Sequence, residues 1–257
     1  MYLSYLLINV GDNPDRPRPG RLWLRNMYRV HQRLCMAFPT SIRKEDDPDF
    51  VKGFRSDDFQ HVHGQRTADQ AFLFRLDPRT GGNPVIIVQS ALKPDWEYAF
   101  HNASYLLAAP PQMKPYDPQF REGQILNFRL MANATRKKDK ENRPEGKNNF
   151  GRRVPVPANE IEAWLTSRAM RSGFEVENLT NVQTGYLEAF KDKGDPISSD
   201  VKVDGEKDGR LKRFFYARFE GKIRVSAPDS VRDTVMQGIG PGKAFGLGLL
   251  SIAMGSD

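Results

Sequence analysis

Near its end the chain reads Gly238-Ile239-Gly240-Pro241-Gly242-Lys243-Ala244-Phe245-Gly246-Leu247-Gly248-Leu249-Leu250, with five glycines in eleven residues. Just upstream, Pro228-Asp229-Ser230 is a typical helix start, followed by an apolar stripe of Val231, Val235 and Met236. The apolar run after the glycines predicts a strand. The expected order is therefore helix, glycine-rich turn, strand.

The glycine-rich turn is a candidate anion-binding site. Glycine permits positive φ and a close approach of the backbone to a ligand, so successive N–H groups can line a concave anion site. Lys243 adds a positive charge, and the ligand that we expect is a phosphate backbone. The simpler alternative is a tight helix-to-strand connection that needs glycine only for its shape. The candidate RNA-binding residues in this turn are Gly238, Gly240, Gly242, Lys243, Gly246 and Gly248.

Two better-known glycine motifs do not fit this turn. A Walker A loop requires Ser or Thr after Gly-Lys, but Ala244 follows Lys243, and Gln237 stands where the first glycine belongs. A dinucleotide fingerprint requires a long βαβ unit, and only nine residues follow Gly248.

The composition favours a polyanionic partner. The 257 residues allow one large domain or two of about 100 residues each. Lys and Arg outnumber Asp and Glu by 39 to 32, which gives a net charge of +7 and a pI near 9.5. Because neutralised phosphates release counterions, this balance suits nucleic acid, although many basic proteins bind none.

The cysteine and histidine content argues against a metal site. Cys35 is the only cysteine, which excludes an intrachain disulfide and a cysteine-based zinc site, and its apolar neighbours predict a small buried side chain. His61 and His63 can chelate a metal on a strand, but no other His or Cys lies near them in sequence. We therefore expect solvated loop histidines, no metal and no cofactor.

The chain has no sequence feature of a membrane protein. No apolar run approaches the roughly 20 residues that span a bilayer. Met1-Tyr2 opens a strand rather than a basic signal peptide. We expect a cytoplasmic protein without membrane contact.

A helix is predicted for residues 21–38, ending before Pro39. On a helical wheel Tyr28 and His31 lie one turn apart on the flank of the buried stripe, where both are half buried and half wet. The phenol of Tyr28 and the imidazole of His31 can thus contact the same ligand atom, as a general acid or base requires. The alternative is that His31 is an ordinary histidine at the boundary of the core.

The predicted elements give the same order twice, and the fold class that we expect is α+β. The first half reads as strand, helix, two strands, a weak helix and a short edge strand, the second as strand, helix, two strands, helix and strand. This βαββαβ order is the ferredoxin-like arrangement, also the plan of RNA recognition motifs. We expect two tandem ferredoxin-like domains, at residues 1–110 and 124–257, with a linker at 111–123. The expected strands are 1–10, 71–76, 84–90, 124–134, 174–190 (interrupted near Gly185), 211–225 and 249–252, and the expected helices after the first are 95–107 and 157–172.

Basic residues are concentrated at positions 136–153, where eight of 18 are Lys or Arg. A solvated charge run is the usual interpretation of such a loop. Beside an anion-binding glycine turn, contact with RNA phosphates becomes the more favourable one. The candidate RNA-binding residues of this group are Lys137, Lys138, Arg152 and Arg153, together with Arg129 on strand 124–134.

Residues 238–250 resemble the C-terminal glycine-rich loop of the repeat-associated CRISPR proteins and are most similar to the CasE type. The opening strand Met1-Tyr2-Leu3-Ser4 and the segment Tyr28-Arg29-Val30-His31-Gln32 agree with that family, and the pieces fall in the family's order. CasE-like proteins process CRISPR precursor RNA in the type I-E Cascade system. Residues 40–69 and 136–153 are longer than in the shorter relatives.

The resemblance implies a function. CasE-like enzymes carry a tyrosine and a histidine at this spacing on the first helix as the cleavage site, so Tyr28 and His31 are the implied catalytic residues. It implies metal-independent cleavage within the CRISPR repeat, 3′ of the stem-loop, by 2′-OH attack that leaves 2′,3′-cyclic phosphate and 5′-OH ends. The implied partners are the repeat RNA stem-loop and the other Cascade subunits, without direct contact with DNA.

Two alternatives to the nuclease stay open. Some relatives with the same glycine loop are non-catalytic subunits that bind CRISPR RNA, and such a subunit would not need Tyr28 and His31. An unrelated RNA-modifying enzyme is the third hypothesis, and the lack of a cofactor motif or metal cluster in the sequence disfavours it.

Overall fold

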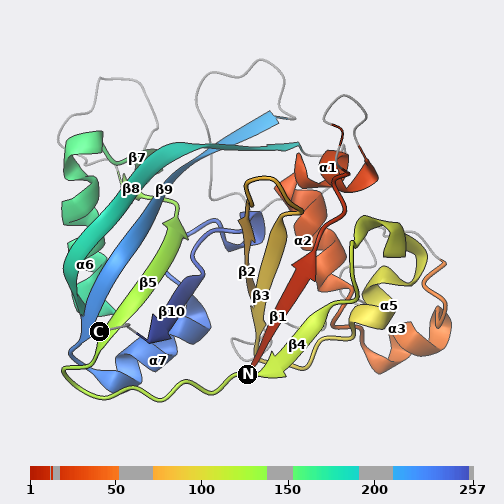
Figure 1. Cartoon of the computed structure of the whole chain (residues 1–257), viewed down its shortest axis with the longest axis horizontal. Helices are drawn as coiled ribbons and strands as arrows, with labels where there is room; N and C mark the ends of the chain where they lie inside the picture. Colours follow the sequence, from red (N-terminus) through yellow and green to blue (C-terminus); the bar gives the residue numbers. More distant parts are fainter. Residues whose placement is uncertain (12, 14–17, 52–71, 138–152, 191–210, 255–257) are drawn as a thin grey trace, which may run out of the picture.

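The computed structural model describes residues 1–11, 13, 18–51, 72–137, 153–190 and 211–254, and its long strands form two antiparallel sheets (Figure 1). In the first sheet the strand order is β2-β3-β1-β4, so that β1 and β3 are central. Its strands are β1 (Tyr2–Leu7), β2 (Phe72–Asp77), β3 (Val85–Ser90) and β4 (Gln112–Pro115).

The first helix of this half differs from the sequence prediction. The single helix predicted for residues 21–38 is wrong, because the chain breaks at Asn26. The Asn26 side chain accepts a hydrogen bond from the Tyr28 N–H at 3.1 Å and so begins a new helix, a role for which asparagine is strongly preferred. The helices are α1 (Pro19–Leu24), α2 (Met27–Cys35), α3 (Ser41–Asp46), α5 (Trp96–Phe100) and the 3₁₀ segment η2 (His101–Leu106).

The second sheet has the order β10-β5-β9-β8, with its first and third strands again in the centre. The strands and helices of this second half are β5 (Ile125–Ala132), η3 (Ala158–Glu160), α6 (Ile161–Arg171), β8 (Phe174–Phe190), β9 (Leu211–Val225), α7 (Pro228–Gln237), η4 (Lys243–Phe245) and β10 (Leu250–Met254). A separate short ribbon pairs β6 (Thr135–Lys137) with β7 (Arg153–Pro155).

The strands of this half follow their sequence patterns closely. Along β5, alternate residues are buried: Leu126, Phe128, Leu130 and Ala132. The interruption predicted near Gly185 is wrong, because the β8–β9 ladder runs through that residue and its irregularities lie between Val176 and Asn181. A Cβ on Gly185 would lie 2.7 Å from the Tyr216 hydroxyl, so a side chain there would require the Tyr216 ring to shift.

Two apolar cores stabilise the molecule, and the first is built from both halves. The far ends of β8 and β9 reach across to α2, and Figure 1 shows this long arm passing over the top of the first sheet. Ala189 and Phe214 from the arm, with Phe245 and Leu247 from the glycine-rich loop, are buried in the core of the N-terminal half. The second core lies between the second sheet and helices α6 and α7.

Candidate active site

Tyr28 and His31 lie one turn apart on α2, with their ring centroids 6.3 Å apart. Both are buried, with 7% and 6% of their surface exposed, so the half-wet flank predicted from the helical wheel is wrong. The additional cover comes from elements that are distant in sequence: the ring of Phe245 lies 6.0 Å from Tyr28, and that of Phe72 lies 5.3 Å from His31.

The imidazole of His31 is held on several sides. It stacks on Phe72 and, at 6.2 Å, on Phe74, both on β2. The Sγ of Cys35, one turn along α2, lies 3.6 Å from Nε2 and 4.0 Å from Nδ1. The burial predicted for Cys35 is confirmed. These contacts restrict the ring plane of His31, as directed proton transfer requires.

The glycine-rich loop uses its glycines for conformation and for close packing. All five have positive φ, from 73° to 94°. Where the loop closes, the Ile239 N–H donates to the Gly248 carbonyl at 2.9 Å, and the Gly248 N–H donates to Met131 of β5 at 2.7 Å. A Cβ on Gly238 would lie 2.8 Å from that Gly248 oxygen, so a side chain is sterically excluded there.

Several loop amides are already used within the protein. The N–H groups of Gly238, Gly246 and Gly248 each donate to a backbone carbonyl, so these three glycines shape the loop rather than offer an anion their amides. Gly240 and Gly242 are only partly buried, and the Lys243 side chain reaches solvent. The protein around Lys243 nevertheless desolvates its ammonium and lowers its pKa from the usual value.

Phe245 connects the loop to the Tyr28–His31 pair. It is buried, and its ring stacks on Phe214 of β9 at 4.0 Å as well as lying beside Tyr28. The structure thereby brings together two predicted groups of site residues from opposite ends of the sequence. The sequence analysis did not single out Phe245, since nothing in the motif distinguishes an inward-facing ring from an ordinary core residue.

The predicted basic residues lie in different places. Lys137 and Arg153 face each other across the β6–β7 ribbon, with Lys137 exposed. Arg129 lies elsewhere, on β5, where its guanidinium pairs with Asp77 and Glu220. The predicted RNA-binding residues Lys138 and Arg152, like the histidine pair at 61 and 63, lie outside the described residues.

Two arginines near the ribbon were missed by the sequence analysis. Arg168 and Arg171 lie one turn apart at the end of α6, and the Arg168 guanidinium lies over the Trp164 ring, 5.6 Å from its centroid. Burial, and the nearby charges of Arg171 and Arg153, lower the pKa of Arg168. The i, i+3 spacing of two arginines on a predicted helix beside a cationic loop was the signal that could have found them.

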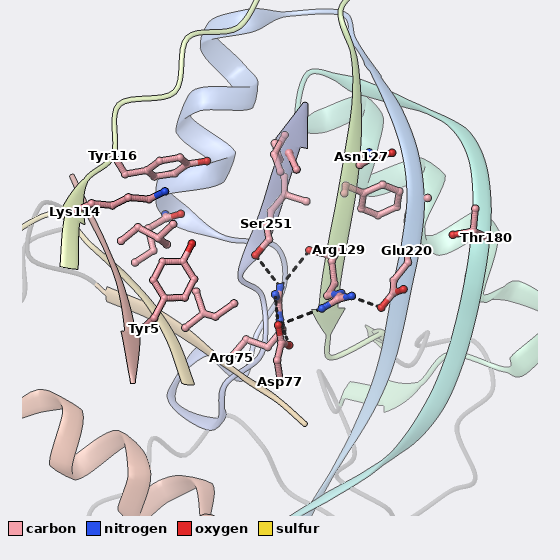
Figure 2. Close-up of a pocket in the computed structure, with 18 residues that line it drawn as sticks. Tyr5, Arg75, Asp77, Lys114, Tyr116, Asn127, Arg129, Thr180, Glu220 and Ser251 are labelled. Carbon is pink, nitrogen blue, oxygen red and sulfur yellow. Dashed lines mark hydrogen bonds and ion pairs between the residues drawn. The ribbon is translucent and has the colours of Figure 1, made fainter. Parts of the chain in front are cut away.

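A pocket of 610 Å³ lies between the two sheets, apart from Tyr28, His31 and the glycine-rich loop. Burial raises the pKa of Tyr116 in this pocket, with a further contribution from Tyr5. Figure 2 shows side chains of the first sheet on one wall and of the second on the other, among them Tyr5, Lys114 and Tyr116 opposite Asn127, Arg129, Thr180 and Glu220.

The floor of this pocket carries an ion network that joins the halves (Figure 2). Arg75, only 3% exposed, donates to Asp77 from Nε at 2.7 Å and to Ser251 Oγ from Nη1 at 2.9 Å. Asp77 also pairs with Arg129 at 3.2 Å, and Arg129 Nε lies 2.9 Å from Glu220. Burial alone would raise the pKa of Asp77, but the hydrogen bonds and charges of Arg75 and Arg129 outweigh it and lower that pKa.

The comparisons with known proteins agree with this arrangement. Residues 1–254 match the family described as CRISPR associated protein. The chain belongs to this family. Within it, the chain is similar to the CRISPR-associated endoribonuclease Cse3 of Thermus thermophilus, at 30% identity over 98% of this chain and all of that relative. Within the family, the chain is therefore assigned to the Cse3/CasE type of CRISPR endoribonuclease, the type I-E Cascade subunit.

A second relative and a solved structure support the assignment. The Cascade subunit CasE of Escherichia coli is 29% identical over 98% of this chain and 99% of its own length. A solved structure of the endoribonuclease Cse3 bound to a 19-nucleotide RNA superposes with a TM-score of 0.66, at 29% identity over 98% of this chain and all of that chain. The two antiparallel four-stranded sheets thus match a Cse3 structure.

Among the residues that the structure describes, no group of three or more His, Cys, Asp or Glu side chains is arranged to hold a metal ion. None of the described helices combines the length and the apolar character needed to cross a membrane.

Proposed function

We propose that this protein is an endoribonuclease that cleaves CRISPR precursor RNA within the repeat, 3′ of the stem-loop, and stays bound to the product as a Cascade subunit. The observation that carries the proposal is the placement of Tyr28 beside His31 on α2, under the glycine-rich loop, in a member of the Cse3/CasE family. The names of the relatives, an endoribonuclease and a Cascade subunit, support the activity and the partner.

The proposed reaction needs no metal ion. The 2′-oxygen of the RNA forms a bond to the adjacent phosphorus while the bond from phosphorus to the 5′-oxygen breaks, which leaves a 2′,3′-cyclic phosphate and a 5′-OH. One proton leaves the 2′-OH and one reaches the 5′-oxygen, so the site must supply a base and an acid. We assign proton transfer to His31, with Tyr28 orienting the nucleophile or sharing the transfer. Nearby cations would stabilise the charge that develops on the phosphoryl oxygens.

RNA binding is proposed for the basic surface of the second half. Lys137 and Arg153 on the ribbon, with Arg168 and Arg171 at the end of α6, form a group of positive charges suited to phosphates. Lys243 is a further candidate because its ammonium is partly desolvated yet reaches solvent. Arg129 is a weaker candidate because its guanidinium is already engaged by Asp77 and Glu220. Arg75 and Arg218 share these two carboxylates, so the group as a whole keeps one net positive charge.

We further propose that both halves are ferredoxin-like domains. Each has the βαββαβ order with its first and third strands central, and the connection from β4 to β5 crosses between the sheets. The predicted boundaries, residues 1–110 with a linker at 111–123, would leave β4 (Gln112–Pro115) outside the first domain, although it pairs with β1. We therefore propose that the first domain extends through β4, that the rest of the linker follows it, and that the second domain covers residues 124–257.

The deciding experiment uses a hairpin RNA from the host's CRISPR repeat, in EDTA, with the native chain and His31→Ala. We expect the native chain to cut once at the base of the stem. His31→Ala should bind with the native Kd and cut at least about 100-fold more slowly, the range for loss of a general acid or base. RNA with a 2′-deoxy group at the scissile site should bind and stay uncut.

One observation favours a second candidate, a non-catalytic RNA-binding subunit. Tyr28 and His31 are more than nine-tenths buried, which also suits a purely structural role in the core. The same experiment separates the two, because a binding subunit would hold the 2′-hydroxyl RNA without cutting it. That result would overturn the nuclease proposal.

A further inference from the structure

The inner end of the glycine-rich loop is a wedge between the two halves. Phe245 is 6% exposed, and its ring stacks on Phe214 with an interplanar angle of 27°. It also lies beside the ring of Tyr28, with an angle of 31° between the planes. The phenol of Tyr28 thus has an aromatic neighbour that comes from the other half of the chain.

The loop backbone fixes where this wedge lies. A Cβ added to Gly246 would lie 3.1 Å from Cε of Met27 and 3.2 Å from the ring of Phe74, so the backbone packs directly on α2 and β2. The Phe245 N–H donates to the Gly242 carbonyl at 2.9 Å, which holds the residue in a 3₁₀ turn. Phe245 therefore has little freedom to move away from Tyr28.

The aromatic rings beside Tyr28 and beside His31 come from different halves of the chain. His31 has the rings of β2 and the thiol of Cys35 around it, all within the first half. Tyr28 takes an aromatic contact from the loop instead. A reacting group that is held loosely loses rate steeply, since a displacement of about 1 Å can cost about 100-fold.

We propose that Phe245 is a positioning residue: it sets the orientation of the Tyr28 ring, and the glycine-rich loop contributes to RNA cleavage through that contact. The inference rests on the proposed nuclease function and adds a role for the loop other than phosphate binding. This role accounts for the amides of Gly246 and Gly248, which donate hydrogen bonds within the protein. They hold the loop that carries Phe245.

The test compares Phe245→Leu, Tyr28→Phe and the double variant on the repeat hairpin RNA. Single-turnover cleavage rates are measured with protein in saturating excess over the RNA. The Kd is measured with the 2′-deoxy RNA. We expect Phe245→Leu to slow cleavage about tenfold with Kd within about twofold of native, because only the orientation of Tyr28 changes. In the Tyr28→Phe background the same substitution should have little further effect, since coupled residues are not additive.

Phe174→Leu is the matched control for a loss of core packing. Phe174 is fully buried in the second core, remote from Tyr28, so the substitution should lower the melting temperature without slowing cleavage. Phe214→Leu removes the ring on which Phe245 stacks and gives a second route to the same effect if Phe245→Leu fails to fold.

The outcomes separate the two proposals. If the native chain cuts and Phe245→Leu cuts at the native rate, or slows cleavage by the same factor with and without the Tyr28 hydroxyl, the positioning role is overturned. A rise in Kd without a change in rate overturns it too, in favour of a loop that acts on binding. If the native chain does not cut at all, the nuclease proposal fails first and the positioning role fails with it.

Discussion

Two of the junctions between the halves of the molecule have opposite chemical character. At one, Phe245 of the second half stacks on Phe214 and packs against Tyr28 of the first half, and the contact is aromatic and buried. At the other, Arg75 and Asp77 of the first half meet Arg129, which is half exposed in a polar pocket. Both connect the same two halves of the chain.

The difference between them teaches what each is suited to do. Aromatic packing holds a fixed geometry and responds little to pH or salt, which suits the surroundings of a candidate catalytic pair. A charged network stabilises only while its partners stay ionised and matched, and its gain is offset by desolvation. We therefore expect the aromatic junction to control cleavage and the charged junction to control stability.

The largest effect on stability is expected from Asp77→Ala at the charged junction. Arg75 would remain 3% exposed without its carboxylate, and an unpaired buried charge costs about 3 kcal/mol of unfolding free energy. Urea unfolding measures it. Glu188→Ala is the control, because the Arg213–Glu188 pair is 55% and 45% exposed and should contribute less than about 1 kcal/mol. Equal losses in the two variants would contradict the importance of burial.

The next largest effect tests the backbone of the aromatic junction. Gly238→Ala should cost about 2 kcal/mol, from a residue held at φ 73° and ψ 165°, a conformation that only glycine adopts readily, and from a Cβ placed 2.8 Å from the Gly248 oxygen. Gly81→Ala is a control matched in φ alone: its φ is 69°, and no atom lies within 4 Å of the added Cβ. It should cost only about 1 kcal/mol, the strain of a left-handed alanine. If unfolding shows no gap between the variants, the tight closure of the loop is not what requires glycine.

The smallest effect is a pH dependence that should separate the junctions. The pKa of Asp77 is lower in the folded chain than its usual value, so its contribution to stability is present above a pH of about 4 and is lost as pH falls through the folded pKa. The destabilisation caused by Asp77→Asn should therefore shrink between pH 7 and pH 3. That caused by Phe245→Leu should stay constant, because no charge is involved. The unfolding free energies of both variants and of the native chain are measured at the two pH values. If the effects of the two substitutions change equally with pH, the junctions do not differ in their dependence on charge.

The sequence was sufficient for most of the fold because its local patterns were consistent. The strand predicted for residues 124–134 corresponds to β5, and the repeated order of strands and helices predicted two similar halves. The prediction failed at Asn26, where a side-chain cap outweighed the continuous helical pattern. A wheel that places residues on one helix has no information about a side chain that turns back on the backbone.

The site was harder to predict because its contacts are long-range. A helical wheel could bring Tyr28 to His31, but not Phe245 onto Tyr28 or Phe72 onto His31, and these rings account for the unexpected burial. Arg129 was predicted to bind RNA, yet its carboxylate partners lie on β2 and β9. Which charges remain available is decided by how strands pair, and that pairing is not written in any local motif.

The arm formed by β8 and β9 also sets the order in which the molecule can be completed. Synthesis delivers Tyr28 and His31 early, but Phe214 and Phe245, which close the core around them, come near the end. Contacts between residues so far apart in the chain form slowly, because a long loop must close before they contribute. During synthesis the core of the first half therefore stays incomplete until Phe214 and Phe245 have been added. The burial of Tyr28 and His31 is among the last features to form. A chain that stops before the glycine-rich loop would carry both residues in an unfinished site.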